Sequence, residues 1–203
     1  MFEQAGVIGV NSLDEMFDVA QLLAHQPLPR GRRVAVVGNS HALGLLAGDA
    51  AVAAGLTVER AVTLGTDASA EEFEDALDAA IDDRSVDGVV AVYIPPLNVT
   101  GEDVANVLAA VGEQSDKPLV SSFLGAEGIP ELLRVPDVGG ATAGRGSVPS
   151  YPAVEAAVRA LAHAANYAAW LRMQKRADET AIDLSEDTVD LARAKRVVYA
   201  VLH

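Results

Sequence analysis

The stretch from Arg33 to Gly55 constrains the fold of this chain more than any other part of its sequence. It opens with four apolar residues, Val34 to Val37, a run typical of a strand buried on both faces of a parallel sheet. A turn at Gly38-Asn39-Ser40-His41 contains a good N-cap residue, and the helical segment that follows ends at Gly55. A strand, a glycine turn and a helix in succession predict the first unit of an α/β sheet.

The same turn is the first candidate binding site. Ligands of open α/β sheets bind at the carboxyl edge of the strands, and a helix that begins there offers free N–H groups to an anion. The predicted anion-binding residues are therefore Gly38, Asn39, Ser40 and His41. The turn has neither the Gly-x-Gly-x-x-Gly pattern of dinucleotide sites nor the Gly-Lys-Ser/Thr of a P-loop. From these residues alone, an ordinary strand-to-helix turn with a capped helix stays open as the alternative.

The remainder of the chain repeats this succession of a strand and a helix. Residues 1–10 end in a short apolar strand candidate, and Asn11-Ser12 can cap a helix over Leu13 to His25. Further strands are expected at 58–64, 88–94 and 119–124, further helices at 70–83, 102–113 and 153–174, and a short extended piece at 148–151. This pattern predicts an α/β fold with a doubly wound parallel sheet, a flavodoxin-like three-layer sandwich. The sequence leaves the Rossmann strand order open as the alternative.

The boundaries of the globular part follow from changes in composition. We expect one domain over residues 1–174, with an N-terminal strand and helix at 1–26 and the main sheet units at 33–173. Residues 175–187 are polar and typical of a linker. Residues 188–203 have the apolar spacing of an amphipathic helix without an evident partner, so we interpret them as the possible start of a following module.

Charge and composition exclude several classes of function. The formal net charge is −14, which argues against nucleic acid or an anionic membrane as the main partner. The absence of Cys excludes disulfides, thiolate metal sites and a cysteine nucleophile. No His, Asp or Glu spacing resembles a metal site. No apolar run approaches the length of a bilayer span and no signal-peptide pattern is seen, so we expect a cytoplasmic protein.

Three further segments are candidates for the lining of the same cleft. Pro95-Pro96 and Asn98 lie at the carboxyl end of the expected strand 88–94, and Gly125 closes the expected strand 119–124. Arg145 lies in the glycine-rich stretch 139–146, which is long enough to form a mobile lid that contacts an anion. The alternatives are that the prolines only end their strand and that the glycine-rich stretch is an ordinary surface loop.

Several short pieces, in a fixed order and spacing, carry a resemblance to a known family. They are Gln4–Ile8, Pro27–Arg33, Gly38-Asn39, Tyr93–Leu97, Lys117-Pro118 before Phe123–Gly125, and Val148–Pro152 before Ala157–Leu161. Together they cover about residues 3–173. In these pieces the chain resembles the flavodoxin-like ligase domain of the NDP-forming acyl-CoA synthetases, the succinyl-CoA synthetase-like superfamily. Its acetate–CoA ligase (ADP-forming) members are often fused to an acetyltransferase domain.

The resemblance implies a mechanism and a set of partners. Such enzymes interconvert acyl-CoA, phosphate and a nucleoside diphosphate with acid, CoA and the triphosphate, and a histidine held between two helix N-termini carries the phosphoryl group. The helix after Gly38-Asn39 corresponds to one of these two helices. Implied partners are the CoA-binding and ATP-grasp domains of the parent synthetase, which uses phosphate, CoA and ADP or ATP, with Mg in the ATP-grasp module. No tightly bound cofactor is expected in this domain itself.

The chain also departs from the family pattern. The histidine segment precedes Gln4–Ile8 in the family, so we expect this chain to begin after it and to be inactive in isolation. Ser40-His41-Ala42 replace the usual small residues, and Gly65-Thr66-Asp67 replace an Asn-Pro-Val-Asp-type loop. Two functions therefore stay open: a synthetase domain that holds the phosphohistidine or phosphate at a helix N-terminus, or a catalytically degenerate regulatory or oligomerisation module. The second predicts a homodimer through the apolar faces of 13–24 and 153–171.

Overall fold

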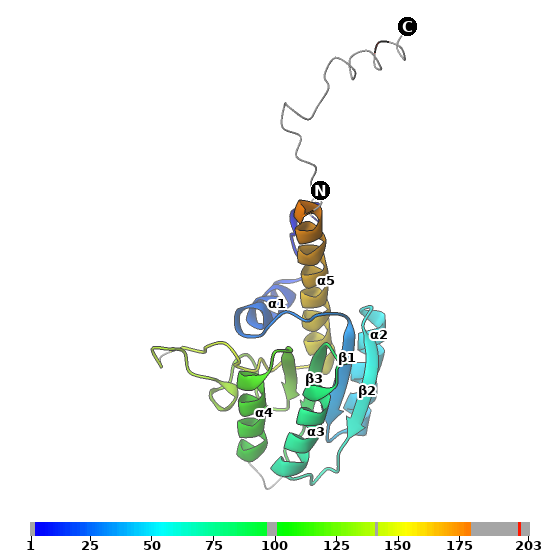
Figure 1. Cartoon of the computed structure of the whole chain (residues 1–203). Coiled ribbons are helices and arrows are strands. Elements are labelled where there is room, and N and C mark those ends of the chain that lie inside the picture. The colour runs from blue at the N-terminus through cyan, green and yellow to red at the C-terminus, as the bar shows by residue number, and fades with distance from the viewer. Residues whose placement is uncertain (1–2, 97–100, 141, 180–198, 200–203) are drawn as a thin grey trace. The chain divides into compact units, whose positions relative to one another are not determined.

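A four-stranded parallel sheet forms the centre of the molecule (Figure 1). The computed structural model describes residues 3–96, 101–140, 142–179 and 199. The strands are β1 (Arg33–Gly38), β2 (Thr57–Thr63), β3 (Gly88–Tyr93) and β4 (Leu119–Phe123), and they lie in the order β2-β1-β3-β4. This order is flavodoxin-like and confirms the predicted doubly wound parallel sheet.

The extended piece at 148–151 occupies the place of a fifth strand beside β4. Ser121 and Ser150 form an isolated parallel bridge. The Ser121 N–H donates to Pro149 O and the Tyr151 N–H donates to Ser121 O, both at 2.9 Å. Because Pro149 has no N–H to donate, the pairing stays this short.

Helices cover both faces of the sheet and complete the three layers. In the described part of the chain the α-helices are α1 (Leu13–His25), α2 (His41–Ala53), α3 (Ala70–Asp82), α4 (Glu102–Gln114) and α5 (Val154–Glu179), with short 3-10 turns at Glu3–Ala5 and Glu131–Leu133. Successive β1 side chains point to opposite faces. Val34 and Val36 join a core with α1, α2 and α5, whereas Ala35 and Val37 join a core with α3 and α4.

The predicted N-terminal strand is wrong, because residues 6–10 form no strand. Gly6 has a φ of +75°, and a Cβ at this position would lie 2.5 Å from the ring of Trp170. The Trp170 Nε1–H donates to Gln4 O at 3.3 Å. Ile8 and Val10 pack against the core on the α1 side of the sheet. The apolar residues of this segment therefore pack against helices and do not pair with the sheet.

The long C-terminal helix also differs from the expectation. We predicted its end at Gln174 and a linker from Lys175, but α5 continues to Glu179, since no Gly or Pro interrupts residues 175–179. The chain divides into a compact unit of Met1–Trp170 and a second unit of Leu171–His203. Of the second unit, the structure describes 171–179 and Tyr199, so the remainder of the expected linker and C-terminal helix lies outside the described residues.

Candidate anion-binding site

The turn between β1 and α2 lies at the carboxyl edge of the sheet, where α2, α3 and α4 all begin (Figure 1). Gly38 is the last residue of β1. A Cβ at this position would lie 2.5 Å from the carbonyl oxygen of Val92 in β3. The glycine is therefore required by the close approach of two neighbouring strands, a reason that the sequence pattern did not indicate.

Asn39 links the ends of β1 and β3. Its side chain is buried, with 3% of the residue exposed. Nδ2 donates to Ile94 O and Oδ1 accepts from the Ile94 N–H, both at 2.9 Å, while the Asn39 N–H donates to Val92 O at 3.2 Å. Asn39 therefore orients the turn, and its side-chain amide is engaged within the fold.

Ser40 caps α2 and leaves adjacent N–H groups open. Its Oγ accepts from the Leu43 N–H at 3.4 Å and its carbonyl accepts from the Gly44 N–H at 2.9 Å. The first N–H groups of a helix have no partner inside the helix. Among the described residues, none accepts from the N–H groups of Ser40, His41 or Ala42. Three consecutive donors therefore lie at the beginning of α2.

The electrostatics of this helix end differ from those of the other α-helices. α2 has no acidic residue in its first turn, whereas α1, α3, α4 and α5 each have at least one. In α3, a capping box also gives the N-cap N–H an acceptor, since the Ser69 N–H donates to Glu72 Oε2 at 2.8 Å. Carboxylates in a first turn offset the positive end of the helix dipole. At α2 that end is left without a carboxylate of its own.

Three more predicted residues lie at the same edge as the turn. His41 is exposed. Pro95 and Pro96 follow Ile94, the residue bonded to Asn39, and are half-buried. Gly125 follows β4 with a φ of +90°. Asn98, the remaining predicted residue at this edge, lies outside the described residues.

Arg145 lies at the opposite edge of the sheet, so the prediction that it lines this cleft is wrong. The neighbouring Gly146 N–H donates to the carbonyl of His25, the last residue of α1, at 2.7 Å. A Cβ at Gly146 would lie 2.7 Å from the Cα of Glu113, in the last turn of α4. Both helices end at the amino edge of the sheet. The glycine-rich stretch returns there because residues 148–151 must start at the amino edge to pair in parallel with β4.

The sequence pattern gave no indication of the role of Gln26, whose side chain binds the end of the glycine-rich stretch to the amino edge of the sheet. Only 3% of the residue is exposed. Its Oε1 accepts from the Leu119 N–H at 2.9 Å, and its Nε2 donates to Ser147 O at 2.7 Å and to Gly146 O at 3.2 Å. A polar residue between an amphipathic helix and Pro27 gives no local signal of such a role, because its partners lie more than ninety residues away in sequence.

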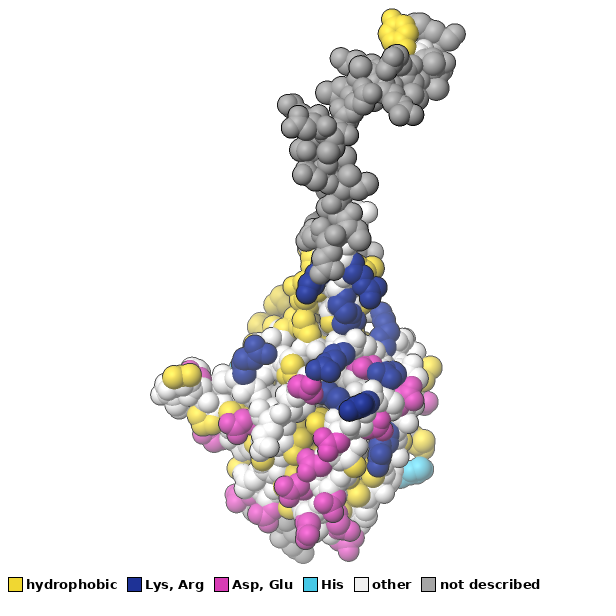
Figure 2. Space-filling model, viewed as in Figure 1, with side chains coloured by type: hydrophobic (Ala, Val, Ile, Leu, Met, Phe, Trp, Pro, Cys, Tyr) yellow, Lys and Arg dark blue, Asp and Glu magenta, His cyan; other side chains and the backbone are white. Residues whose placement is uncertain are grey.

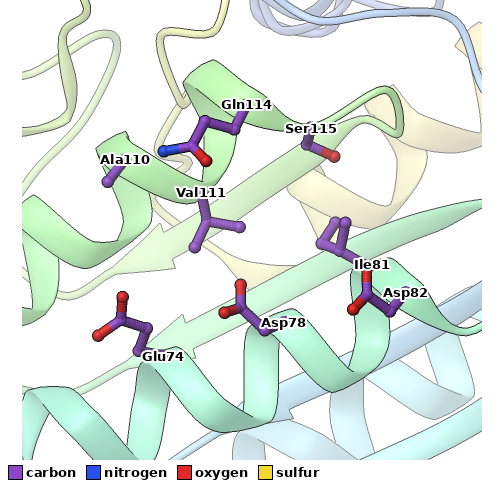
Figure 3. A pocket seen from close by; sticks show the side chains of 8 residues that line it. All are labelled: Glu74, Asp78, Ile81, Asp82, Ala110, Val111, Gln114 and Ser115. Carbon is purple, nitrogen blue, oxygen red and sulfur yellow. The ribbon is translucent and has the colours of Figure 1, made fainter.

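An acidic groove lies on the other face of the sheet, between α3 and α4 (Figure 3). Its volume is about 320 Å³, and it is lined by Glu74, Asp78, Ile81, Asp82, Ala110, Val111, Gln114 and Ser115. Figure 2 shows acidic side chains gathered over the face that α3 and α4 cover. Three carboxylates along one helix repel an anion. The groove is therefore separate from the candidate anion site in both place and charge.

The described residues contain neither a metal-binding cluster nor a membrane-spanning helix. Among them, no three His, Cys, Asp or Glu side chains come together in a way that could hold a metal ion. None of the described helices is both long and apolar enough to cross a bilayer.

Comparison with known proteins gives relatives along most of the chain. No protein-family model matches it. The 4-hydroxybutyrate–CoA ligase [ADP-forming] of Nitrosopumilus maritimus is 23% identical over 193 residues, which cover 85% of this chain and 26% of that protein. The alpha subunit of acetate–CoA ligase [ADP-forming] I of Pyrococcus furiosus is 24% identical over 196 residues, covering 86% of this chain and 41% of the subunit.

Solved structures share the fold. The dinucleotide forming acetyl-coenzyme A synthetase 1 of Ca. Korarchaeum cryptofilum, in its apo form, has a TM-score of 0.71 at 18% identity. The matched region is 89% of this chain and 43% of that protein's chain. The same protein in complex with phosphate and ADP has the same TM-score. A Pyrococcus horikoshii protein has a TM-score of 0.69 at 21% identity, covering 84% of this chain and 43% of its own.

These relatives confirm the resemblance to the NDP-forming acyl-CoA synthetases. Homologues of the chain are ADP-forming acyl-CoA synthetases, alpha subunits among them, and they match most of its length. The chain spans about a quarter of the first of these relatives and less than half of the second.

Proposed function

We propose that this chain, a homologue of ADP-forming acyl-CoA synthetases, is a domain of such an enzyme and holds phosphate or a phosphohistidine at the beginning of α2. The observation that carries the proposal is the row of N–H groups at Ser40, His41 and Ala42, which have no acceptor among the described residues. A phosphoryl group is a doubly charged anion. Donors at the positive end of a helix stabilise such an anion by about 1–2 kcal/mol when the site is partly buried.

Each residue of the turn has its own part in this proposal. Asn39 fixes the direction of the turn through Ile94, and Gly38 lets β1 approach β3 closely enough for that bond. Ser40 caps the helix with its hydroxyl and offers its own N–H. His41 offers its N–H, and its exposed ring adds a donor when it turns toward the anion.

The proposed reaction divides the work among domains. The parent synthetase would interconvert acyl-CoA, phosphate and ADP with acid, CoA and ATP. In this scheme the CoA-binding domain supplies CoA, and the ATP-grasp domain supplies the nucleotide with its Mg. This domain contacts the phosphoryl group alone, through the backbone donors at the beginning of α2.

A titration with inorganic phosphate tests the site. In ¹⁵N-labelled protein we expect chemical-shift changes centred on the amides of Ser40, His41 and Ala42. Proline is well tolerated at the first position of a helix, so His41→Pro removes one donor and keeps α2. We expect it to weaken phosphate binding about five-fold, equivalent to about 1 kcal/mol. His41→Ala is the matched control, because it removes the ring and keeps the N–H.

The alternative function makes the opposite prediction. The replacement of small residues by Ser40-His41-Ala42 favours a regulatory or oligomerisation module that kept the fold and lost the pocket. Such a module would give no shift at these amides with phosphate. Equal affinities of His41→Pro and the unchanged protein would likewise contradict the proposed site.

A further inference from the structure

Helix α1 has an exposed apolar seam that no described residue covers. Leu13 is 70% exposed and Phe17 is 59% exposed, and Ala20 and Ala24 on the same side are also exposed. The spacing of these four residues, four, three and four positions apart, is that of the seam along which two helices pack knobs into holes. The fold uses the other side of the helix, where Val19 and Leu22 are buried.

We propose that a second copy of this chain covers the seam through antiparallel packing of α1 against α1. In this arrangement Leu13 of one copy lies opposite Ala24 of the other, and Phe17 lies opposite Ala20. Each large side chain then meets a small one, so the two helices can approach closely. A parallel arrangement would instead place Phe17 against Phe17 and Ala20 against Ala20, which crowds one level and leaves a gap at the next.

The residues beside the seam also favour the antiparallel pairing. Exposed Met16 would lie opposite half-buried Leu23, and Asp14 would lie opposite Gln21. The carboxylates of α1 lie in its first half, at Asp14, Glu15 and Asp18, and its last turn has His25 as the basic residue. A twofold axis therefore brings the acidic half of each helix against the half of its partner that has no acid. The helix dipoles are then antiparallel as well.

The other exposed faces lack these features. The apolar side of α5, which we also expected to self-associate, is used within the fold, since Ala157, Leu161 and Ala164 are fully buried. The outer face of α3 has six acidic residues and is an ordinary solvated face: Glu71, Glu72, Glu74, Asp75, Asp78 and Asp82. On α2, exposed Leu45 and Val52 lie one heptad apart, but the seam position between them is the exposed carboxylate Asp49, which interrupts the apolar face.

The size of the seam predicts a weak dimer. Thirteen helical residues extend about 20 Å, and a strip about 10 Å wide along them covers on the order of 200 Å². Standard stable interfaces bury about 800 Å² on each partner. We therefore expect a weak dimer that exchanges fast with the monomer.

Sedimentation analysis of the 203-residue chain from about 10 µM to about 1 mM tests the association. We expect the mean mass to rise toward that of a dimer. Phe17→Glu should weaken the association by at least about tenfold. Leu45→Glu is the matched control, since Leu45 is also 59% exposed but lies on α2, and it should leave the association unchanged. Thermal unfolding of both variants checks that they fold.

Cysteine cross-linking tests the orientation, because the chain has no Cys of its own. Leu13→Cys and Ala24→Cys variants, mixed under mild oxidation, should form the mixed disulfide in preference to either symmetric one, since a disulfide requires Cα atoms within about 7 Å. A preferred Leu13→Cys symmetric disulfide would overturn the antiparallel arrangement. A monomer throughout the concentration range, or an association that Phe17→Glu leaves intact, would overturn the proposal as a whole.

Discussion

The side-chain amide of Asn39 forms two hydrogen bonds with the backbone of Ile94, one as donor and one as acceptor, each at 2.9 Å. Asn39 follows β1 and Ile94 follows β3, so this pair joins two neighbouring strands at the edge where α2 begins. The direction in which α2 leaves the sheet, and with it the direction of the open N–H groups, depends on this contact.

Replacement of Asn39 should loosen that edge. Asn39→Ala leaves the Ile94 N–H and carbonyl without their partner, which costs about 2–3 kcal/mol of unfolding free energy. For a unit of this size the melting temperature should fall by roughly 5–10 °C. Phosphate binding at α2 should weaken in parallel, as measured by the amide titration. Asn39→Asp keeps the acceptor but sets a buried carboxylate oxygen against the Ile94 carbonyl, so at neutral pH its loss of stability should equal or exceed that of Asn39→Ala; an Asn39→Asp variant as stable as the unchanged chain would contradict the paired role.

Alanine at Gly38 should be destabilising, whereas alanine at Gly44 should not. A Cβ at Gly38 would lie 2.5 Å from Val92 O, so β1 and β3 must move apart, and we expect a loss of about 1–3 kcal/mol. Nothing lies within 4 Å of a Cβ at Gly44, and alanine within a helix is favoured by about 1 kcal/mol over glycine. Chemical denaturation should therefore show opposite signs for the two variants. If Gly38→Ala leaves the free energy of unfolding unchanged, the close approach of β1 and β3 does not require glycine at this position.

Removal of the Gln26 side chain should release the glycine-rich stretch. Gln26→Ala leaves the buried Leu119 N–H and Ser147 carbonyl without this partner, with an expected cost of about 2–3 kcal/mol. Limited proteolysis within residues 139–146 should become faster under native conditions. Gln114→Ala, at the end of α4, is the control and should leave both the stability and the cleavage rate close to those of the unchanged chain.

Acid should weaken the fold through Asp87. Burial raises the pKa of this carboxyl, but its hydrogen bonds with the side chain and backbone of Arg33 outweigh burial, so the folded-state pKa lies below the usual value. A lowered folded-state pKa adds stability that is fully present above the unfolded-state pKa of about 3.9 and is lost as the pH falls through the folded-state pKa. Urea denaturation from pH 7 downward should show this loss below about pH 4.

Asp87→Asn provides the comparison for this pH dependence. It removes the titrating group, so the variant should be less stable at neutral pH and should lose less stability on acidification than the unchanged chain. Parallel stability curves for the two proteins below pH 4 would show that the Asp87–Arg33 pair does not contribute to the acid sensitivity.

Local patterns in the sequence were sufficient to predict most of the elements. The buried run Val34–Val37, the cap at Ser40 and the stop at Gly55 correspond to β1 and α2, and the expected helix from Leu13 to His25 agrees with α1 at both ends. These signals act within a few residues, through burial, capping and glycine conformation. The parallel arrangement follows from the alternation of strands and helices, and it places the turn at the carboxyl edge.

The N-terminal segment and α1 show where local pattern is insufficient. An apolar run such as residues 6–10 suits a strand or a packed coil equally, and the contact of Gly6 with Trp170 decides for the coil. Helix α1 is apolar on two sides, and its periodicity does not indicate which side the fold buries. The structure buries Val19 and Leu22 and leaves Leu13 and Phe17 exposed.

Signals between residues close together along the chain were thus enough to predict the four strands of the sheet, the helices between them and the edge at which α2 begins. The roles of Gly38, Asn39 and Gln26, and the place of Arg145 at the far edge, became apparent from the folded chain alone. Those outcomes depend on contacts between residues more than fifty positions apart, such as Asn39 with Ile94 and Gln26 with Leu119. The sheet creates these contacts, and no local pattern encodes them.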